Sequence, residues 1–169
     1  MATENTGKLI GEVHLSRIPT APISLRKAME SDAWAIAELA SDLGYLTSGP
    51  VMRRRIKAVL GSEADLLIVA VDRSNKVVGW LQAHASEVVE SGFRAEIVGM
   101  IVSETARRGG VGRLLVAKAE TWARKISAPA MVVRSNIKRR ASHKFYSALG
   151  YKPIKTQVVY RKELSRLAG

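Results

Sequence analysis

From residue 23 onward the apolar positions follow two periods, of two residues and of about 3.6 residues, which predict strands and helices in alternation. The expected strands are the alternating or continuous apolar segments 23–28, 66–71, 77–85, 94–102, 130–134 and 156–161. The expected helices have apolar residues three and four apart and cover 31–43, 51–60, 113–126 and 138–149. Residues 1–21 lack a period and are expected to form a tail. The pattern therefore predicts a single α/β domain over residues 22–169.

Composition places the chain among ordinary globular proteins, because 47% of its 169 residues are hydrophobic and 25% are charged. No apolar run approaches the roughly 18 residues of a membrane helix, so no membrane partner is expected. The N-terminus lacks the long apolar run of a secretory signal. Cysteine is absent, which excludes disulfides and a thiolate nucleophile and makes the cytoplasm the expected compartment.

Positive charge is concentrated in the last two fifths of the chain. The formal net charge is +12, and residues 101–169 hold 16 basic and 3 acidic side chains. Such a field attracts nucleic acid, an anionic membrane or a phosphate-bearing cofactor, although a solvated basic face would give the same count. Aromatic residues make up only 5% of the chain and do not interleave the basic cluster, which argues against nucleic-acid binding.

A glycine-rich turn, Arg107-Arg108-Gly109-Gly110-Val111-Gly112, joins the strand at 94–102 to the helix at 113–126. Glycine allows positive φ and lets a ligand approach the main chain without a Cβ in the way. The first helical turn then offers unpaired N–H groups and a partial positive charge. This combination is typical of a site that holds phosphate oxygens.

Two common phosphate-binding motifs do not fit this turn. The dinucleotide motif G-x-G-x-x-G needs a third glycine where the chain has Leu115, and the Walker sequence G-x-x-x-x-G-K-[ST] does not occur. The remaining pattern is [RQ]-x-x-G-x-[GA], which Arg107, Gly110 and Gly112 match.

Together with three further segments in the same order, this turn resembles the GNAT superfamily of acetyl-CoA-dependent N-acetyltransferases. The strand 95–102 is similar to the family's fourth strand, and Ser135-Asn136 to the end of its fifth. The segment 142–151, with His143, Phe145, Tyr146, Gly150 and Tyr151, resembles the family's H-x-F-Y-x-x-x-G-[FY] signature. The resemblance covers about residues 23 to 164.

The resemblance implies a mixed, twisted β-sheet with helices on both faces and splayed central strands that admit the pantetheine arm of acetyl-CoA. The main chain of three residues would pair with that arm, and these are Ile101, Val102 and Ser103. The diphosphate would be held by residues of the glycine turn, which are Arg107, Arg108, Gly109, Gly110, Val111, Gly112 and Arg113. Asn136 would bond the arm near the thioester.

Direct attack by an amine needs no enzyme nucleophile but requires a proton acceptor, because an alkylammonium has a pKa of roughly 10. Glu96, the one charged residue inside its strand, is the candidate base, and the alternative is a glutamate paired with a basic neighbour. Tyr146 is the candidate acid for the departing sulfur, and the alternative is a tyrosine packed with Phe145. Three scattered histidines without an H-E-x-x-H motif give no reason to expect a metal site.

Other polar residues have weaker functional interpretations. His143 is expected to be structural or to lie at the cofactor edge, and His84 to be an ordinary strand histidine. The cluster Lys138-Arg139-Arg140 would hold the 3′-phosphate of coenzyme A or be simply solvated. Residues 53–55, three arginines, are expected on a solvated helix face.

The sequence thus predicts an acyltransferase that moves an acetyl group from acetyl-CoA to a primary amine, with a small molecule favoured over a peptide or protein as acceptor. A basic nucleic-acid-binding domain and an acyl-CoA sensor without turnover are the alternatives of another class. Whether the chain is a monomer or a homodimer stays open.

Overall fold

A computed structural model describes residues 22–41 and 44–164, and the predicted tail at 1–21 lies outside the described residues. The chain divides into two compact units between Arg134 and Ser135. Among the residues described, the first unit carries a five-stranded sheet and three α-helices, and the second carries one α-helix. No helix among the described residues is long and apolar enough to cross a bilayer.

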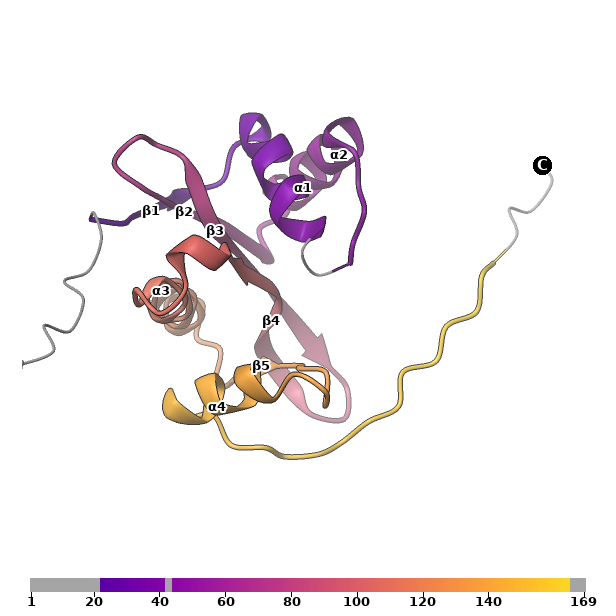
Figure 1. Ribbon diagram of the computed structural model, residues 1–169. Coiled ribbons are helices and arrows are strands. Elements are labelled where there is room, and N and C mark those ends of the chain that lie inside the picture. Colours follow the sequence, from indigo (N-terminus) through magenta and orange to yellow (C-terminus); the bar gives the residue numbers. More distant parts are fainter. Residues whose placement is uncertain (1–21, 42–43, 165–169) are drawn as a thin grey trace, which may run out of the picture. The chain divides into compact units, whose positions relative to one another are not determined.

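The strands of the first unit lie in chain order, β1 to β5, across one sheet (Figure 1). They are β1 (Ser24–Lys27), β2 (Asp65–Val71), β3 (Val77–Val88), β4 (Gly92–Val102) and β5 (Met131–Val133). The first four are antiparallel to their neighbours, and β5 is parallel to β4. The sheet is therefore mixed, as the sequence predicts.

Helices cover both faces of this sheet (Figure 1). They are α1 (Ala33–Ser41) and α2 (Gly49–Leu60) on one face and α3 (Val111–Lys125) on the other. Alternation along β2 divides its side chains between the faces, so that Leu67, Val69 and Val71 pack with α1 and α2. Leu115, which is fully buried, projects from α3 toward Gly79 on the opposite face.

A buried ion pair fixes the start of α1 against the first strand. Both carboxylate oxygens of Asp32 accept hydrogen bonds from the Arg26 guanidinium, at 2.7 and 2.8 Å, and one also accepts from the Met29 N–H at 2.8 Å. Burial alone would raise the pKa of Asp32, but these hydrogen bonds and the charge of Arg26 outweigh it and hold the pKa below its usual value. The pair anchors the turn that opens α1 to β1.

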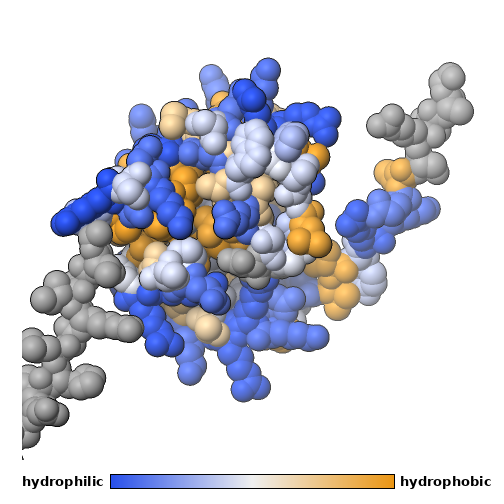
Figure 2. Space-filling view, turned by 45° about the horizontal axis from the view of Figure 1, so that its top comes forward, coloured by the Kyte–Doolittle hydropathy of each residue, from blue (hydrophilic) through white to orange (hydrophobic). Residues whose placement is uncertain are grey.

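The second unit holds α4 (Arg140–Ala148) and the segment 151–164, which forms no strand. The predicted strand at 156–161 is wrong, because its apolar residues pack against nothing: Val158, Val159 and Tyr160 are 74%, 86% and 89% exposed. The segment mixes hydrophobic and hydrophilic residues along its length (Figure 2). An alternating pattern forms a strand only where a neighbouring strand and a core are available to it.

Candidate functional site

The glycine turn reverses the chain through two residues in the left-handed region. After β4 ends at Val102, a short 3₁₀ turn (Glu104–Ala106) leads to Arg108, with φ of 63°, and to Gly110, with φ of 82°. Gly110 is the residue that precedes the first turn of α3. A Cβ built on Gly110 would have no heavy atom within 4 Å, so the space beside its main chain is open.

The start of α3 offers main-chain donors to this open space. The first helical hydrogen bond runs from the Leu114 N–H to the Gly110 carbonyl at 3.1 Å, so the N–H groups of Val111, Gly112 and Arg113 precede the helical ladder. No acidic residue stands in the first turn of α3. An anion at this position would meet the positive end of the helix dipole and the exposed guanidinium of Arg113.

Arg107 does not point into the open space. Its Nε donates to the Val102 carbonyl at 3.1 Å, and one terminal nitrogen lies 3.2 Å from the Glu104 carboxylate. The arginine of the predicted motif therefore ties the turn to the end of β4. The sequence pattern gives no sign of this contact, since it marks only that an arginine stands there.

The fourth strand has an open edge over its last residues. Its pairing with β5 covers only Ala95–Ile97, and at the next residue, Val98, a bulge interrupts its pairing with β3. A bulge bends the strand that carries the extra residue. Within the described part of the chain, residues 98–102 have no strand partner on the β5 side, which is the splay that the sequence predicts.

Alternation of hydrogen bonds decides which residues present their main chain at this edge. The Ser103 N–H donates to the Val78 carbonyl at 2.9 Å, so Ser103 and, two residues earlier, Ile101 direct their main-chain groups to β3. Val102 and Met100 therefore direct theirs to the open edge. Of the three predicted residues, Val102 has this orientation and Ile101 and Ser103 do not; Met100, which is not among them, shares it because of the register of β3 with β4.

Glu96 lies on β4 just before the bulge and is paired with a basic neighbour. Its carboxylate is 3.1 Å from Nε of Arg134, and its side chain is only 12% exposed. On β3 the residue directly opposite is His84. Residues directly opposite in an antiparallel pair share one face of the sheet, so Glu96 and His84 are side-by-side neighbours there.

A second acidic residue lies on the far side of His84. Nδ1 of His84 is 3.2 Å from Oδ1 of Asp65, on β2, and the same oxygen accepts a hydrogen bond from the Gln82 side chain at 3.2 Å. The structure thus aligns Asp65, His84 and Glu96 across three strands. Asp65 escapes the sequence analysis because nothing in its local pattern shows that it pairs with His84.

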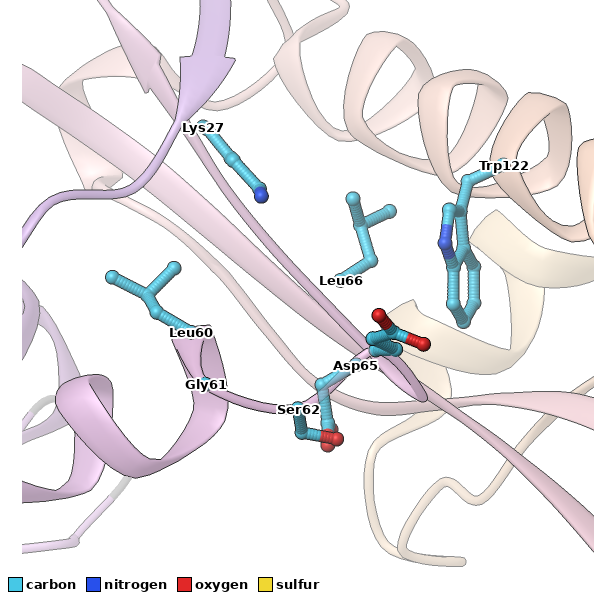
Figure 3. Close-up of a pocket in the computed structure, with 8 residues that line it drawn as sticks. Lys27, Leu60, Gly61, Ser62, Asp65, Leu66 and Trp122 are labelled. Carbon is cyan, nitrogen blue, oxygen red and sulfur yellow. The ribbon is translucent and has the colours of Figure 1, made fainter.

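Asp65 also lines an open hollow beside the free end of β2 (Figure 3). Lys27, at the end of β1, and Trp122, on α3, stand on opposite sides of the hollow, and the Asp65 carboxylate lies on the Trp122 side. The same lining includes Glu63. The hollow therefore places charged side chains of both signs next to the polar row of the sheet.

The second unit contains the other predicted site residues. The Tyr146 ring lies edge-on to those of Phe145 and Tyr151, with centroids 5.1 and 5.6 Å away. Burial raises the pKa of the Tyr146 phenol, so it stays protonated well past neutral pH. Oδ1 of Asn136 accepts the Lys138 N–H at 2.9 Å, which shapes the turn before α4.

The remaining candidates have contacts of their own. Nε2 of His143 is 3.1 Å from the Asn136 carbonyl, which agrees with a structural role for this histidine. Residues 138–140 and Lys144 are exposed, as both interpretations of that cluster require. On α2, Arg53 pairs with Glu30 at 3.0 Å.

Comparison with known proteins gives a family for this arrangement. The family model described as "Acetyltransferase (GNAT) family" matches residues 33–151. The aminoalkylphosphonate N-acetyltransferase of Salmonella typhimurium is 35% identical over 81 residues, which span 47% of this chain and only 53% of that enzyme.

Two solved structures have the same fold at low identity. The aminoglycoside 6′-N-acetyltransferase AAC(6′)-Ih from Acinetobacter baumannii superposes with a TM-score of 0.74 at 18% identity, over 85% of this chain and 100% of that one. The aminoglycoside N-acetyltransferase AAC(6′)-Iy in complex with CoA gives 0.76 at 17% identity, over 88% of this chain and 100% of that one. These likenesses concern the fold.

Proposed function

Because the chain belongs to the GNAT family of acetyltransferases, we propose that it transfers the acetyl group of acetyl-CoA directly to a primary amine of a small molecule. The observation that carries the proposal is the open space beside Gly110, bounded by the donors of the first turn of α3. The open edge of β4 begins at the same end of the sheet. The pantetheine arm needs the open edge, and the diphosphate needs the donors of the turn that follows it along the chain.

The residues present fit the donor. Main-chain N–H groups at 111–113 would hold the diphosphate oxygens, supported by the exposed guanidinium groups of Arg108 and Arg113. The main chain of Met100 and the N–H of Val102 would pair with the amides of the pantetheine arm as an added strand does, since the Val102 carbonyl already accepts a hydrogen bond from Arg107. Arg107 would act on the donor indirectly, by holding the turn against β4. Asn136 is proposed to bond the arm near the thioester.

Bound acetyl-CoA supplies an acyl group activated as a thioester. The chain's own task is to orient the amine, to take its proton and to protonate the departing sulfur. We propose that Glu96 faces the acceptor's ammonium group and draws its proton away. Tyr146 is proposed to protonate the sulfur, for which its raised pKa is suitable because the phenol keeps its proton at neutral pH.

A small amine is the proposed acceptor, on the support of what the relatives are named for. The Salmonella relative is named for aminoalkylphosphonates, and the structural neighbours are named for aminoglycosides. Both classes are small molecules with primary amines. A peptide N-terminus or a lysine side chain is the competing acceptor, and the experiment below includes both.

The test is release of free coenzyme A thiol from acetyl-CoA in a panel of amines: aminoalkylphosphonates, aminoglycosides, polyamines, and peptides with free N-termini or lysines. We expect one small-molecule class to be acetylated well above hydrolysis, with the amide product seen by mass spectrometry. Turnover with peptides alone would overturn the small-molecule assignment. No turnover together with no acetyl-CoA binding by calorimetry would overturn the proposed function.

Matched variants separate chemistry from folding. Glu96→Gln and Tyr146→Phe should each lower kcat by about 100-fold or more, as the loss of a general base or acid does. Glu87→Gln on the exposed end of β3 and Tyr160→Phe in the exposed C-terminal segment remove the same groups elsewhere and should leave kcat unchanged. If a variant and its control lower kcat equally, the residue changed in that variant has no role as base or acid.

A further inference from the structure

The row of Asp65, His84 and Glu96 across three neighbouring strands contains more proton-accepting groups than the proposed function has used. We propose that His84 is the terminal proton acceptor of the reaction: Glu96 passes to it the proton that the acceptor amine gives up, and Asp65 holds its imidazole in place. This inference rests on the proposed function and deepens it.

Glu96 alone has no direct route for releasing a proton. Its carboxylate is already engaged by the Arg134 guanidinium, at 3.1 Å. With only 12% of its side chain exposed, Glu96 also has little direct contact with water through which to discharge. A proton taken from an ammonium group therefore needs a second acceptor beside Glu96.

His84 can both accept a proton from Glu96 and release it to water. It stands directly opposite Glu96, and the Cβ atoms of such pairs are about 4.5–5.5 Å apart, so the two side chains are within reach of each other. Imidazole is the side chain whose ordinary titration range lies nearest neutral pH. The His84 side chain is 43% exposed, which lets it release the proton to water after each turnover.

Asp65 gives the imidazole its orientation. Nδ1 of His84 is the nitrogen that faces the Asp65 carboxylate, at 3.2 Å, which leaves Nε2 for the proton. Asp65 itself is 12% exposed and is held by the Gln82 amide. A carboxylate in this position favours the tautomer with the proton on Nδ1, which leaves Nε2 as the accepting nitrogen. Asp65 is thus a positioning residue.

The proposed step balances. The ammonium group of the acceptor loses one proton, which moves across the Glu96 carboxylate to Nε2 of His84. The freed amine nitrogen forms a bond to the thioester carbon, and the carbon–sulfur bond breaks with its electron pair on sulfur. The sulfur gains a proton from Tyr146, which takes back the proton that the new amide nitrogen sheds. The imidazolium then releases its proton to water, so that one proton is released per amide formed.

Charged groups of both signs surround this histidine. Asp65 faces it from β2 and Glu96 from β4, and Arg134, which follows β5, pairs with Glu96. Lys27 lines the hollow on the other side of Asp65 (Figure 3), and Glu63 belongs to the same lining. An acidic residue thus flanks the imidazole on each side within the row.

The first experiment measures kcat, and KM for both substrates, of wild type and His84→Gln between pH 6 and 9. We expect kcat of the variant to fall about 100-fold at pH 7, with the deficit shrinking at high pH as hydroxide replaces the missing base, and with the affinity for acetyl-CoA unchanged. In His84→Gly, added imidazole should restore part of kcat. Ser86→Ala, two residues further along the same face of β3, is the control and should match wild type.

The second experiment reads the histidine in the wild-type protein without turnover. A ¹⁵N–¹H correlation spectrum of the imidazole nitrogens at pH 8 should show His84 with its proton on Nδ1, and Asp65→Asn should shift it toward the Nε2–H form. A wild-type spectrum with the proton on Nε2 would overturn the proposal even if His84→Gln does not fold.

Three kinetic outcomes are decisive. A His84→Gln variant with the kcat and pH profile of wild type, beside an inactive Glu96→Gln, would leave Glu96 as the sole base and remove His84 from the reaction. Loss of acetyl-CoA binding together with kcat, without rescue by imidazole, would mean a structural role. Absence of turnover in wild type itself would overturn the proposed function, and this inference with it, before any variant is compared.

Discussion

Replacing Gly110 by alanine should impose two separate costs, one on folding and one on binding of the donor. Gly110 has a φ of 82°, in the region where a Cβ strains the backbone by about 1–2 kcal/mol. In a chain of this length each kcal/mol corresponds to a shift of about 2–4 °C in Tm, so Tm should fall by roughly 2–8 °C. Nothing within 4 Å meets the new methyl group, so no clash adds to this cost.

The second cost arises only when acetyl-CoA binds. The methyl group of Gly110→Ala would occupy the open space through which the diphosphate approaches the first turn of α3. Loss of one hydrogen bond to a charged oxygen costs about 1.5–3 kcal/mol, and each 1.4 kcal/mol is a factor of ten in Kd. Calorimetric titration with acetyl-CoA should therefore show Kd raised about 10- to 100-fold.

The chain offers a matched control in Gly44, which has a φ of 83° and likewise no heavy atom within 4 Å of an added Cβ. Gly44→Ala should lower Tm by a similar amount and leave the Kd for acetyl-CoA unchanged. If Gly110→Ala loses stability but binds acetyl-CoA as tightly as wild type does, then the donor does not approach this main chain. The assignment of the turn to the diphosphate would be refuted.

Three further changes test other contacts. Gly99→Ala would bring a Cβ to 2.9 Å from the Trp80 ring and should destabilise the fold by about 1–3 kcal/mol in urea titrations, whereas Gly61→Ala, with 3.5 Å to its nearest neighbour, should be nearly neutral. Tyr146 has a raised pKa, so a kcat that depends on its protonated phenol should persist to pH 10 or above. If kcat of wild type falls below pH 10 and kcat of Tyr146→Phe does not, the acid role is contradicted. The pKa of Asp32 is lowered in the fold, so its ionised carboxylate stabilises the fold above the unfolded pKa of about 3.9, and this stabilisation is lost as pH falls through the folded pKa. Asp32→Asn should therefore lower the free energy of unfolding by about 2–3 kcal/mol at pH 7 and by much less at pH 2. A difference between variant and wild type that does not change with pH would contradict this role of Asp32.

Local patterns predicted the strands and helices of the first unit well, because each of these segments has its own apolar period in the sequence. The glycine turn is an example: Gly110 takes the left-handed conformation and α3 begins directly after it, as the motif indicates. The strand predicted at 156–161 failed for the opposite reason, since alternation describes a preference and the partner that would satisfy it is supplied by the rest of the molecule.

The contacts that sequence could not supply are those set by register. The pairing of Asp65 with His84 joins residues 19 positions apart through the alignment of β2 with β3, which no local pattern encodes. The bulge at Val98 likewise decides that Met100, and not Ile101, presents its main chain at the open edge. Glu96 stands out in the sequence as the charged residue inside its strand, but its partner Arg134 follows a different strand, which no local pattern shows.

The bulge has a consequence for how chains of this kind can change length. Val98 is the one surplus residue in the pairing of β3 with β4, and it stands where β5 stops pairing. Deleting a single amino acid there would remove the bulge, restore continuous pairing of β3 with β4 and straighten β4. Insertions and deletions between Glu96 and the glycine turn should therefore be far less tolerated than substitutions in the same stretch.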